Sequence, residues 1–110
     1  MESKNSVYGC ALNPHKLSWC PSGSSSGEGA LVAFRGSVLG IGTDVGGSVR
    51  SPALSNGCFG SKPTSDRIPY AKQQVLFPNG YPGIVPTAGP LAHSARDLQL
   101  FCKSIVQSQG

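Results

Sequence analysis

Apolar and polar residues follow one another in blocks along this chain, and one early block has the pattern of a helix. Ser26 is followed by Glu28 and then by the apolar run 29–34. A serine with an acidic residue close behind is typical of a helix N-terminus. We predict a helix of two to three turns that ends near Gly36, although the apolar run would also tolerate a strand.

The clearest helical pattern stands near the end of the sequence. Ser94 and Asp97 have the spacing of a capping box, which predicts a helix over residues 94–107. The apolar positions that follow recur at helical spacing: Leu98, Phe101, Cys102 and Ile105. We expect this apolar face to be core material.

Residues 38–43 form an apolar run interrupted by glycines, which predicts a buried strand that another backbone approaches closely. This strand leads directly into the polar segment 44–48. A short helix is predicted to begin near Ser51 and Pro52, because proline suits the first helical turn.

The remaining segments carry turn signals. Leu17 and Trp19 alternate with polar residues, which hints at a short edge strand in an otherwise irregular lead-in over residues 1–21. Prolines and the Asn79-Gly80 step predict a loop region over residues 64–93. The expected fold class is α/β, with the serine- and glycine-rich residues 22–63 between the lead-in and the loop region.

Composition indicates one small domain with many turns. The chain has 110 residues with 15 glycines and 9 prolines, and only 13% of the residues are charged. Such a sparse charged surface suits a piece that is buried within something larger.

The net charge is +4, but the basic residues are scattered, so we expect no nucleic-acid partner. No apolar stretch approaches membrane length, so we expect no membrane partner. The sequence favours no particular oligomeric state.

The cysteines and histidines are too isolated to predict a metal site. The cysteines show no C-x-x-C spacing, and neither histidine stands beside one: Cys10, Cys20, Cys58, Cys102, His15 and His93. The N-terminus lacks an apolar signal core. We therefore expect reduced thiols in a cytoplasmic protein without a metal site.

Two glycine-flanked serine clusters carry the candidate chemistry. The first is 23–27, with three serines between Gly23 and Gly27, and the second is 46–48, which ends at Ser48. Glycines let a loop turn tightly and present a hydroxyl nucleophile beside its own oxyanion donors. On composition alone, two glycine–serine surface loops explain the same pattern.

Two other interpretations are weaker. The first cluster satisfies G-x-S-x-G around Ser25, with Asp66 and His93 in suitable order, but Pro21 argues against the strand that a nucleophile elbow requires. The second cluster is glycine-rich and follows a predicted strand. However, no lysine precedes Ser48 as a phosphate-binding P-loop demands.

Taken together, residues 23–53 resemble the amidase signature family. That family carries a G-G-S-S-G-G-E-G-A block, an apolar span, and then G-T-D-x-G-G-S-x-R-x-P-A; Ser24 and Ser48 have its spacing of 24 residues. Further matches are the Asn13-Pro14 step and the segments 60–64 and 89–98, so the resemblance spans nearly the whole chain. The run 67–72 is similar to the acetamidase-like general amidases of fungi.

The resemblance implies a partial amidase-signature fold, a fragment of a mixed β-sheet covered by helices. It also implies a Ser–cis-Ser–Lys mechanism on a small amide that uses neither a metal nor an organic cofactor. Ser48 would be the nucleophile that forms an acyl-enzyme, and Ser24 would be the bridging cis-serine. The oxyanion donors would be backbone N–H groups of Ser48 and of three preceding residues: Val45, Gly46 and Gly47. The supporting residues would be Ser25 and Thr43, which hold the loop by hydrogen bonds, with Asp44 and Arg50 as a structural ion pair.

The sequence also departs from the family pattern. Ser22 and Ser26 replace family glycines, so we expect strained backbone at both. The family's catalytic lysine lies on a strand upstream of the N-P step, and the five lysines here stand in unrelated contexts. We therefore expect a truncated amidase that lacks this lysine; the alternative is an inactive remnant or a non-catalytic interaction fragment.

Overall fold

The computed structural model describes residues 2–73 and 83–108. Two short strands come first in the described residues, and three helices and three further strands follow. In chain order the elements are β1 Lys4–Asn5, β2 Gly9–Cys10, α1 Ser26–Ala33, β3 Leu39–Asp44, α2 Arg50–Ser55, β4 Phe59–Gly60, β5 Thr87–Ala92 and α3 Ala95–Gln107. The α/β fold class is therefore confirmed, and the segment after Ser26 is a helix rather than a strand.

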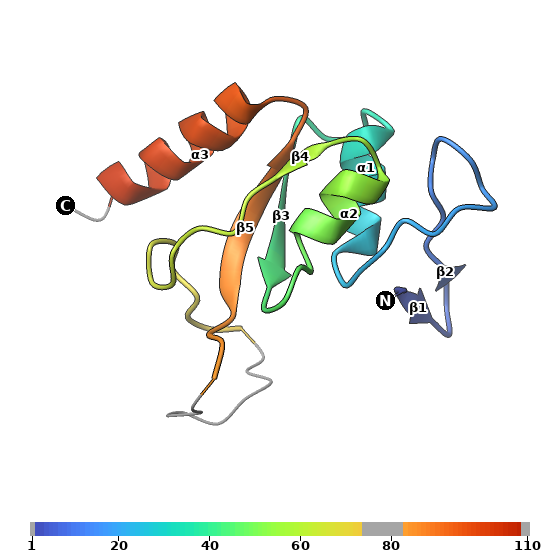
Figure 1. Ribbon diagram of the computed structural model, residues 1–110, viewed down its shortest axis with the longest axis horizontal. Helices are drawn as coiled ribbons and strands as arrows, with labels where there is room; N and C mark the ends of the chain where they lie inside the picture. Colours follow the sequence, from blue (N-terminus) through green and yellow to red (C-terminus); the bar gives the residue numbers. More distant parts are fainter. Residues whose placement is uncertain (1, 74–82, 109–110) are drawn as a thin grey trace.

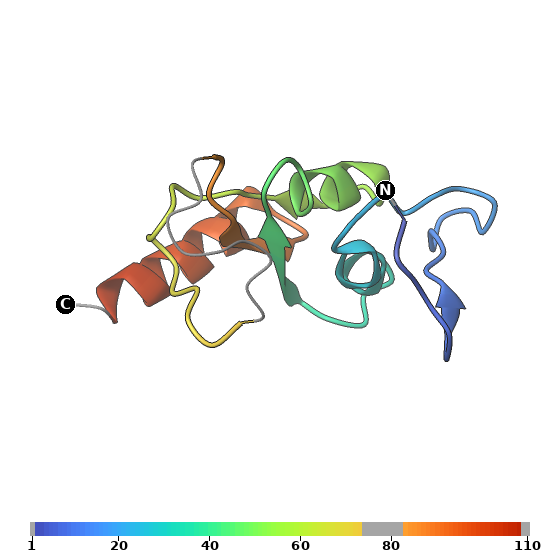
Figure 2. The same ribbon diagram turned by 90° about the horizontal axis from the view of Figure 1, so that it is seen from below.

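The main sheet has three antiparallel strands in the order β3-β5-β4. Figures 1 and 2 show α1 and α2 together on one side of this sheet, with α3 leading away on the other side. The described part is flat and elongated, with extents of 43 × 32 × 21 Å. This arrangement places the chain between β3 and α2 at one end of the sheet.

The buried core is small and lies between α1, α2 and β5. Val32, Val49, Ala53 and Leu91 form it, and Cys58 packs against it. Burial raises the pKa of the Cys58 thiol. Many other large apolar side chains are exposed, among them Val38 at 86%. A core of this size leaves much apolar surface uncovered, as the composition suggested.

The outer edge of β3 is covered by polar side chains. The Ile41 N–H donates to Glu28 Oε1 of α1 at 3.1 Å, and Ser37 Oγ donates to the Leu39 carbonyl at 2.6 Å. Unpaired strand edges invite pairing with other chains, and side chains that bind the free backbone groups counter this. The edge is thus partly satisfied within the chain.

Helix α1 ends at Ala33, and the left-handed residue that terminates it is Arg35 rather than Gly36. Arg35 adopts the left-handed conformation, with φ 66°, and donates its N–H to the Val32 carbonyl. The Gly36 N–H bonds to the Leu31 carbonyl, which completes a Schellman motif. A Cβ at Gly36 would meet Cδ1 of the exposed Leu31 side chain, which can turn aside, and Gly36 has no positive φ, so glycine is not required at this position.

The prediction of a loop throughout residues 64–93 is wrong, because β5 lies within it. Pro90 stands in this central strand opposite Ile41, whose N–H points away towards Glu28. The ladder therefore needs no N–H from Pro90 on that side, and its carbonyl accepts from the Ser61 N–H at 3.1 Å. The predicted Asn79-Gly80 turn lies outside the described residues.

The predicted strand at Leu17 and Trp19 is also wrong. This segment forms a turn closed by a bond from the Trp19 N–H to the Lys16 carbonyl, with the Lys16 ammonium 5.3 Å from the Trp19 ring centroid. The lead-in is not wholly irregular either, because β1 and β2 pair as a hairpin.

Helix α3 begins as predicted, but its apolar face is not core. Ser94 is the N-cap and accepts a hydrogen bond from the Asp97 N–H at 3.1 Å. No described residue of the helix is buried, and the predicted apolar positions are only half-buried. The reason is that α3 packs against β5 and β4 on one side, and no other described helix or strand covers its opposite side.

Candidate active site

The segment between β3 and α2 is folded around the carboxylate of Asp44. Asp44 Oδ1 accepts hydrogen bonds from the Gly47 N–H at 2.7 Å and from Arg50 Nη2 at 3.0 Å. Its Oδ2 accepts from the Val49 N–H at 3.1 Å and from Arg50 N and Nε at 3.3 and 3.0 Å. The predicted Asp44–Arg50 ion pair is present, and the carboxylate also fixes the backbone of the following loop.

Asp44 is fully buried, so its charge depends on these partners. Burial alone would raise the pKa of this carboxyl. The hydrogen bonds from the Arg50 guanidinium and from the N–H groups of Gly47, Val49 and Arg50 outweigh burial and hold the pKa well below its ordinary value. Asp44 is therefore ionised at neutral pH and acts as an anion that organises the loop.

The loop leaves Ser48 nearly buried, at 8% exposure, just before α2. Within residues 2–73 and 83–108, the N–H groups of Val45, Gly46 and Ser48 donate to no acceptor of the chain. The resemblance implied that the Gly47 N–H is an oxyanion donor, but in the structure this N–H donates to Asp44 Oδ1. Three of the four predicted donors therefore have no acceptor in the described chain. Gly47 itself has a φ of 125°, a backbone conformation that favours glycine.

The first serine cluster lies against this loop. The Ser25 N–H donates to the Ser48 carbonyl at 3.1 Å, which brings the two clusters together. The peptide bond between Gly23 and Ser24 is cis, at the residue for which the resemblance implied a cis-serine. Ser24 is exposed, and its carbonyl accepts a hydrogen bond from Ser3 Oγ at 2.8 Å.

Of the two serines that replace family glycines, only one has a left-handed backbone. Ser22 has φ 61°, as the expectation of strain required. Ser26 is the first residue of α1 and is buried, so the expectation of strain there is wrong. Its Oγ donates to the Ser22 carbonyl, which ties the start of the helix to the strained residue.

The two predicted supporting residues act differently from each other. Ser25 holds the loop through its backbone N–H, and its Oγ lies 2.3 Å from where a Cβ at Gly42 would stand. Any larger residue at position 42 would displace Ser25 from β3. Thr43 is half-buried on β3, and within the described part of the chain its side chain has no hydrogen-bond partner.

None of the chain's lysines donates a hydrogen bond to Ser24 or Ser48 in the described residues. Lys62 Nζ instead donates to Thr87 Oγ1 at 3.3 Å, and the Lys16 ammonium lies over Trp19. The other three lie on β1, on a loop and on α3: Lys4, Lys72 and Lys103.

The sequence reading missed a group of polar residues that attach the lead-in to α2. Asn13 Nδ2 donates to the Ser55 carbonyl at 2.7 Å, and His15 Nε2 lies 2.9 Å from the Asn56 carbonyl oxygen. Asn56 Nδ2 bonds in turn to the carbonyls of Pro21 and Pro52, at 2.9 and 2.8 Å. The Asn13-Pro14 step was the available signal. These bonds hold the chain that enters the first serine cluster.

His93 has a structural role that the sequence did not predict. Its Nε2 lies 2.6 Å from the Val32 carbonyl oxygen, so Nε2 carries the proton and donates to it. The corner between β5 and α3 is thereby fixed to the end of α1, at a carbonyl that also accepts the Arg35 N–H.

The described residues hold no group of three or more histidine, cysteine or acidic side chains that could bind a metal. No helix among them is long and apolar enough to cross a membrane.

Comparison with known proteins gives consistent matches over the full chain. The family model described as "Amidase" matches residues 1–110. An "Amidase" of Gibberella moniliformis is 49% identical over 108 residues, which cover 98% of this chain and 20% of that protein. An "Acetamidase" of Emericella nidulans is 44% identical over 105 residues, 96% of this chain and 19% of that protein.

Among solved structures, a "Fatty acid amide hydrolase" superposes with a TM-score of 0.87 at 40% identity. The match covers 97% of this chain and 19% of that one. The chain thus spans about a fifth of the length of the proteins that it matches.

Proposed function

This chain belongs to the amidase family, and we propose that it supplies the serine-bearing part of an active site that hydrolyses the carbon–nitrogen bond of amides. The observation that carries the proposal is the contact between its two serine clusters, through the Ser25 N–H and the Ser48 carbonyl. Around it, Asp44 organises a loop whose N–H groups at Val45, Gly46 and Ser48 have no acceptor in the described chain.

In the proposed reaction, Ser48 Oγ attacks the amide carbonyl carbon while its proton passes to Ser24 Oγ. Ser24 gives its own hydroxyl proton to a lysine amine, which returns a proton to the leaving nitrogen as the carbon–nitrogen bond breaks. Water then cleaves the acyl–Ser48 ester and releases the acid. A serine hydroxyl needs such a route for its proton, because it is a weak nucleophile at neutral pH.

The free N–H groups of the loop would stabilise the negative charge that develops on the carbonyl oxygen. Donors for this purpose must lie about 3 Å from the oxyanion and be held there in advance. The five hydrogen bonds that Asp44 accepts from Gly47, Val49 and Arg50 supply this rigidity. Asp44 is thus a positioning residue, and no step of the reaction passes through it.

We further propose that the substrate is a small amide such as acetamide, and that these residues do not include the lysine base. The Emericella nidulans relative bears the name acetamidase. Because no described lysine reaches Ser24 or Ser48, turnover would require a lysine-bearing segment from elsewhere. The second candidate, a remnant without activity, is favoured by the same lack of a base.

A segment exchange separates these possibilities. The 105 matched residues of the Emericella nidulans acetamidase would be replaced by this chain, and ammonia release from acetamide measured. We expect a folded, active chimera whose activity falls at least about 10⁴-fold in Ser48→Ala and also drops strongly in Ser24→Ala. The control Ser104→Ala changes an exposed serine of α3 and should leave activity unchanged.

A folded chimera without activity would support the remnant instead. Activity that survives Ser48→Ala would remove Ser48 as the nucleophile.

A further inference from the structure

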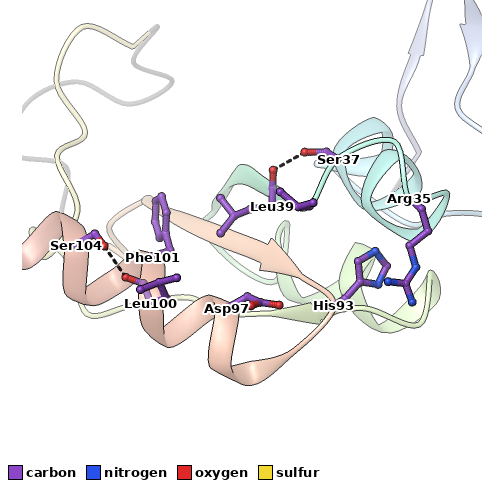
Figure 3. Close-up of a pocket in the computed structure, with 9 residues that line it drawn as sticks. Arg35, Ser37, Leu39, His93, Asp97, Leu100, Phe101 and Ser104 are labelled. Atoms are coloured by element: carbon purple, nitrogen blue, oxygen red, sulfur yellow. Dashed lines mark hydrogen bonds between the residues drawn. The ribbon is translucent and has the colours of Figure 1, made fainter.

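A hollow of about 490 Å³ lies between the end of α1, the start of β3 and α3 (Figure 3). This volume falls in the range of small-molecule sites. Six of its lining residues matter here: Arg35, Leu39, His93, Asp97, Leu100 and Phe101.

The hollow is separate from the serine clusters. It borders Leu39 at the first residue of β3, whereas Asp44 at the last residue leads into the Ser48 loop. An extended strand rises about 3.3 Å per residue, so the two ends of β3 stand roughly 17 Å apart. A ligand in the hollow would therefore not touch Ser48.

The lining has a cationic end and an apolar end. Figure 3 shows the side chains of Arg35 and His93 close together at one end, with Leu100 and Phe101 towards the other. In the described part of the chain, the Arg35 guanidinium has neither an acidic partner nor a hydrogen bond. Unpaired guanidinium beside apolar walls suits an anion with an apolar body.

The backbone at Arg35 adds to this argument. Arg35 occupies the left-handed position of the Schellman motif at the end of α1, with φ 66°. Glycine is the usual residue there, and an arginine costs stability. An arginine at such a position, with its side chain lining a hollow, is better explained by binding than by folding.

One negative charge limits the choice of anion. Asp97 also lines the hollow, and its Oδ2 accepts a hydrogen bond from Ser94 Oγ at 2.7 Å. A dianion would be repelled by this carboxylate, while a monoanion can stay at the Arg35 end.

We propose that this hollow binds a small monocarboxylate with a short aliphatic or aromatic body. The carboxylate pairs with the Arg35 guanidinium, and the body lies against Leu39, Leu100 and Phe101. The proposal goes beyond amide hydrolysis and does not depend on it.

The test is a titration of the 110-residue chain with hexanoate, followed by amide chemical shifts in two-dimensional NMR. We expect saturable shifts centred on Arg35, Leu39 and Phe101, with weaker binding of hexan-1-ol, acetate and the dianion adipate. These probes lack the charge, lack the body or carry a second charge, respectively. Absence of saturable shifts, or equal binding of hexan-1-ol, would overturn the proposal, as would shifts centred on Ser24 and Ser48.

Two variants test whether the Arg35 guanidinium binds the carboxylate. Arg35→Gly should weaken hexanoate binding at least about fivefold and, by relieving the left-handed residue, raise the Tm by a few degrees. Arg67→Gln, at an exposed arginine away from the hollow, should change neither quantity. If Arg35→Gly leaves the affinity unchanged, the carboxylate site is refuted. Ser48→Ala should bind hexanoate like the unaltered chain, so loss of amidase function and loss of this site are distinguishable.

Discussion

The backbone N–H of Ser25 donates a hydrogen bond to the carbonyl oxygen of Ser48, with 3.1 Å between the two atoms. This bond joins two serine clusters that are far apart in the sequence. Gly42 makes the approach possible, because a Cβ there would lie 2.3 Å from Ser25 Oγ. The clusters are therefore held together through the backbone, and the hydroxyl groups of Ser24 and Ser48 are not needed for that contact.

The first prediction concerns the buried anion that shapes the Ser48 loop. Asp44→Asn removes the charge that accepts five hydrogen bonds and leaves Arg50 without its partner. We expect the free energy of unfolding to fall by about 2–4 kcal/mol. Urea denaturation measures the loss, and Asp66→Asn, at an exposed acid, should stay within about 0.5 kcal/mol of the parent. Equal values for the two variants would contradict the role of Asp44.

The second prediction is the acid sensitivity that follows from the same residue. The pKa of Asp44 is lower in the folded chain than in the unfolded chain, where it is about 3.9. Its contribution to stability is therefore complete above about pH 5 and is lost as the pH falls towards the folded pKa. Thermal unfolding between pH 7 and pH 3 should show a falling Tm. The slope should be smaller in Asp44→Asn, and an unchanged slope would show that other groups dominate.

Local signals were enough to predict the helices of this fold. Ser94 and Asp97 marked the N-cap of α3, and Ser26 with Glu28 marked the start of α1. Strand β5 was not predicted, because a proline such as Pro90 fits a central strand only where the neighbouring strands need no N–H from it. That condition depends on the pairing register, which no local pattern contains.

The sequence named the segments of the candidate site, but it did not predict the hydrogen bonds within the site. The family pattern pointed to Ser24 and Ser48, and the structure brings their segments together. It did not show that the Gly47 N–H is used by Asp44, because that bond depends on how the loop turns back on the strand. The bond from His93 to the Val32 carbonyl joins residues distant in sequence, so periodicity could not reveal it either.

The third prediction concerns the strained residue before the first cluster. Ser22 has φ 61°, and its N–H contact with Cys20 Sγ and its carbonyl contact with Ser26 use only its backbone. Ser22→Gly should raise the free energy of unfolding by about 0.5–1 kcal/mol, after the larger entropy of unfolded glycine is subtracted. Ser104→Gly, at an exposed position in the last turn of α3, should lower it by a similar amount. Chemical denaturation of both variants would show whether the two changes have opposite signs.

The fourth prediction concerns the corner between β5 and α3. His93→Ala removes the hydrogen bond to the Val32 carbonyl, and we expect a loss of about 1 kcal/mol in the free energy of unfolding. Amide hydrogen exchange should also quicken near the end of α1, because the corner is no longer attached there. The matched control is Gln99→Ala, at an exposed position of α3. If exchange at α1 stays the same in both variants, the bond does not hold the corner.

The last prediction is that the 110-residue chain alone shows little or no amide turnover. The hydroxyl of Ser48 has no described base within hydrogen-bond reach, and Ser24 could only pass a proton onward. Loss of a base leaves at most the rate that the oxyanion donors give, about 10³–10⁴-fold over water. That residual rate further requires the Val45–Ser48 loop to stay in place, because a displacement of about 1 Å costs roughly 10²-fold more.

Ammonia release from acetamide by the purified chain, beside Ser48→Ala, tests this prediction. We expect both proteins to lie near the uncatalysed rate, while the segment exchange described above restores a Ser48-dependent rate. Robust turnover by the unaltered chain that disappears in Ser48→Ala would contradict the prediction. Since Lys62 and Lys16 are engaged with Thr87 and Trp19, the first lysine to replace in that case would be Lys4, which adjoins the Ser3 that bonds to Ser24.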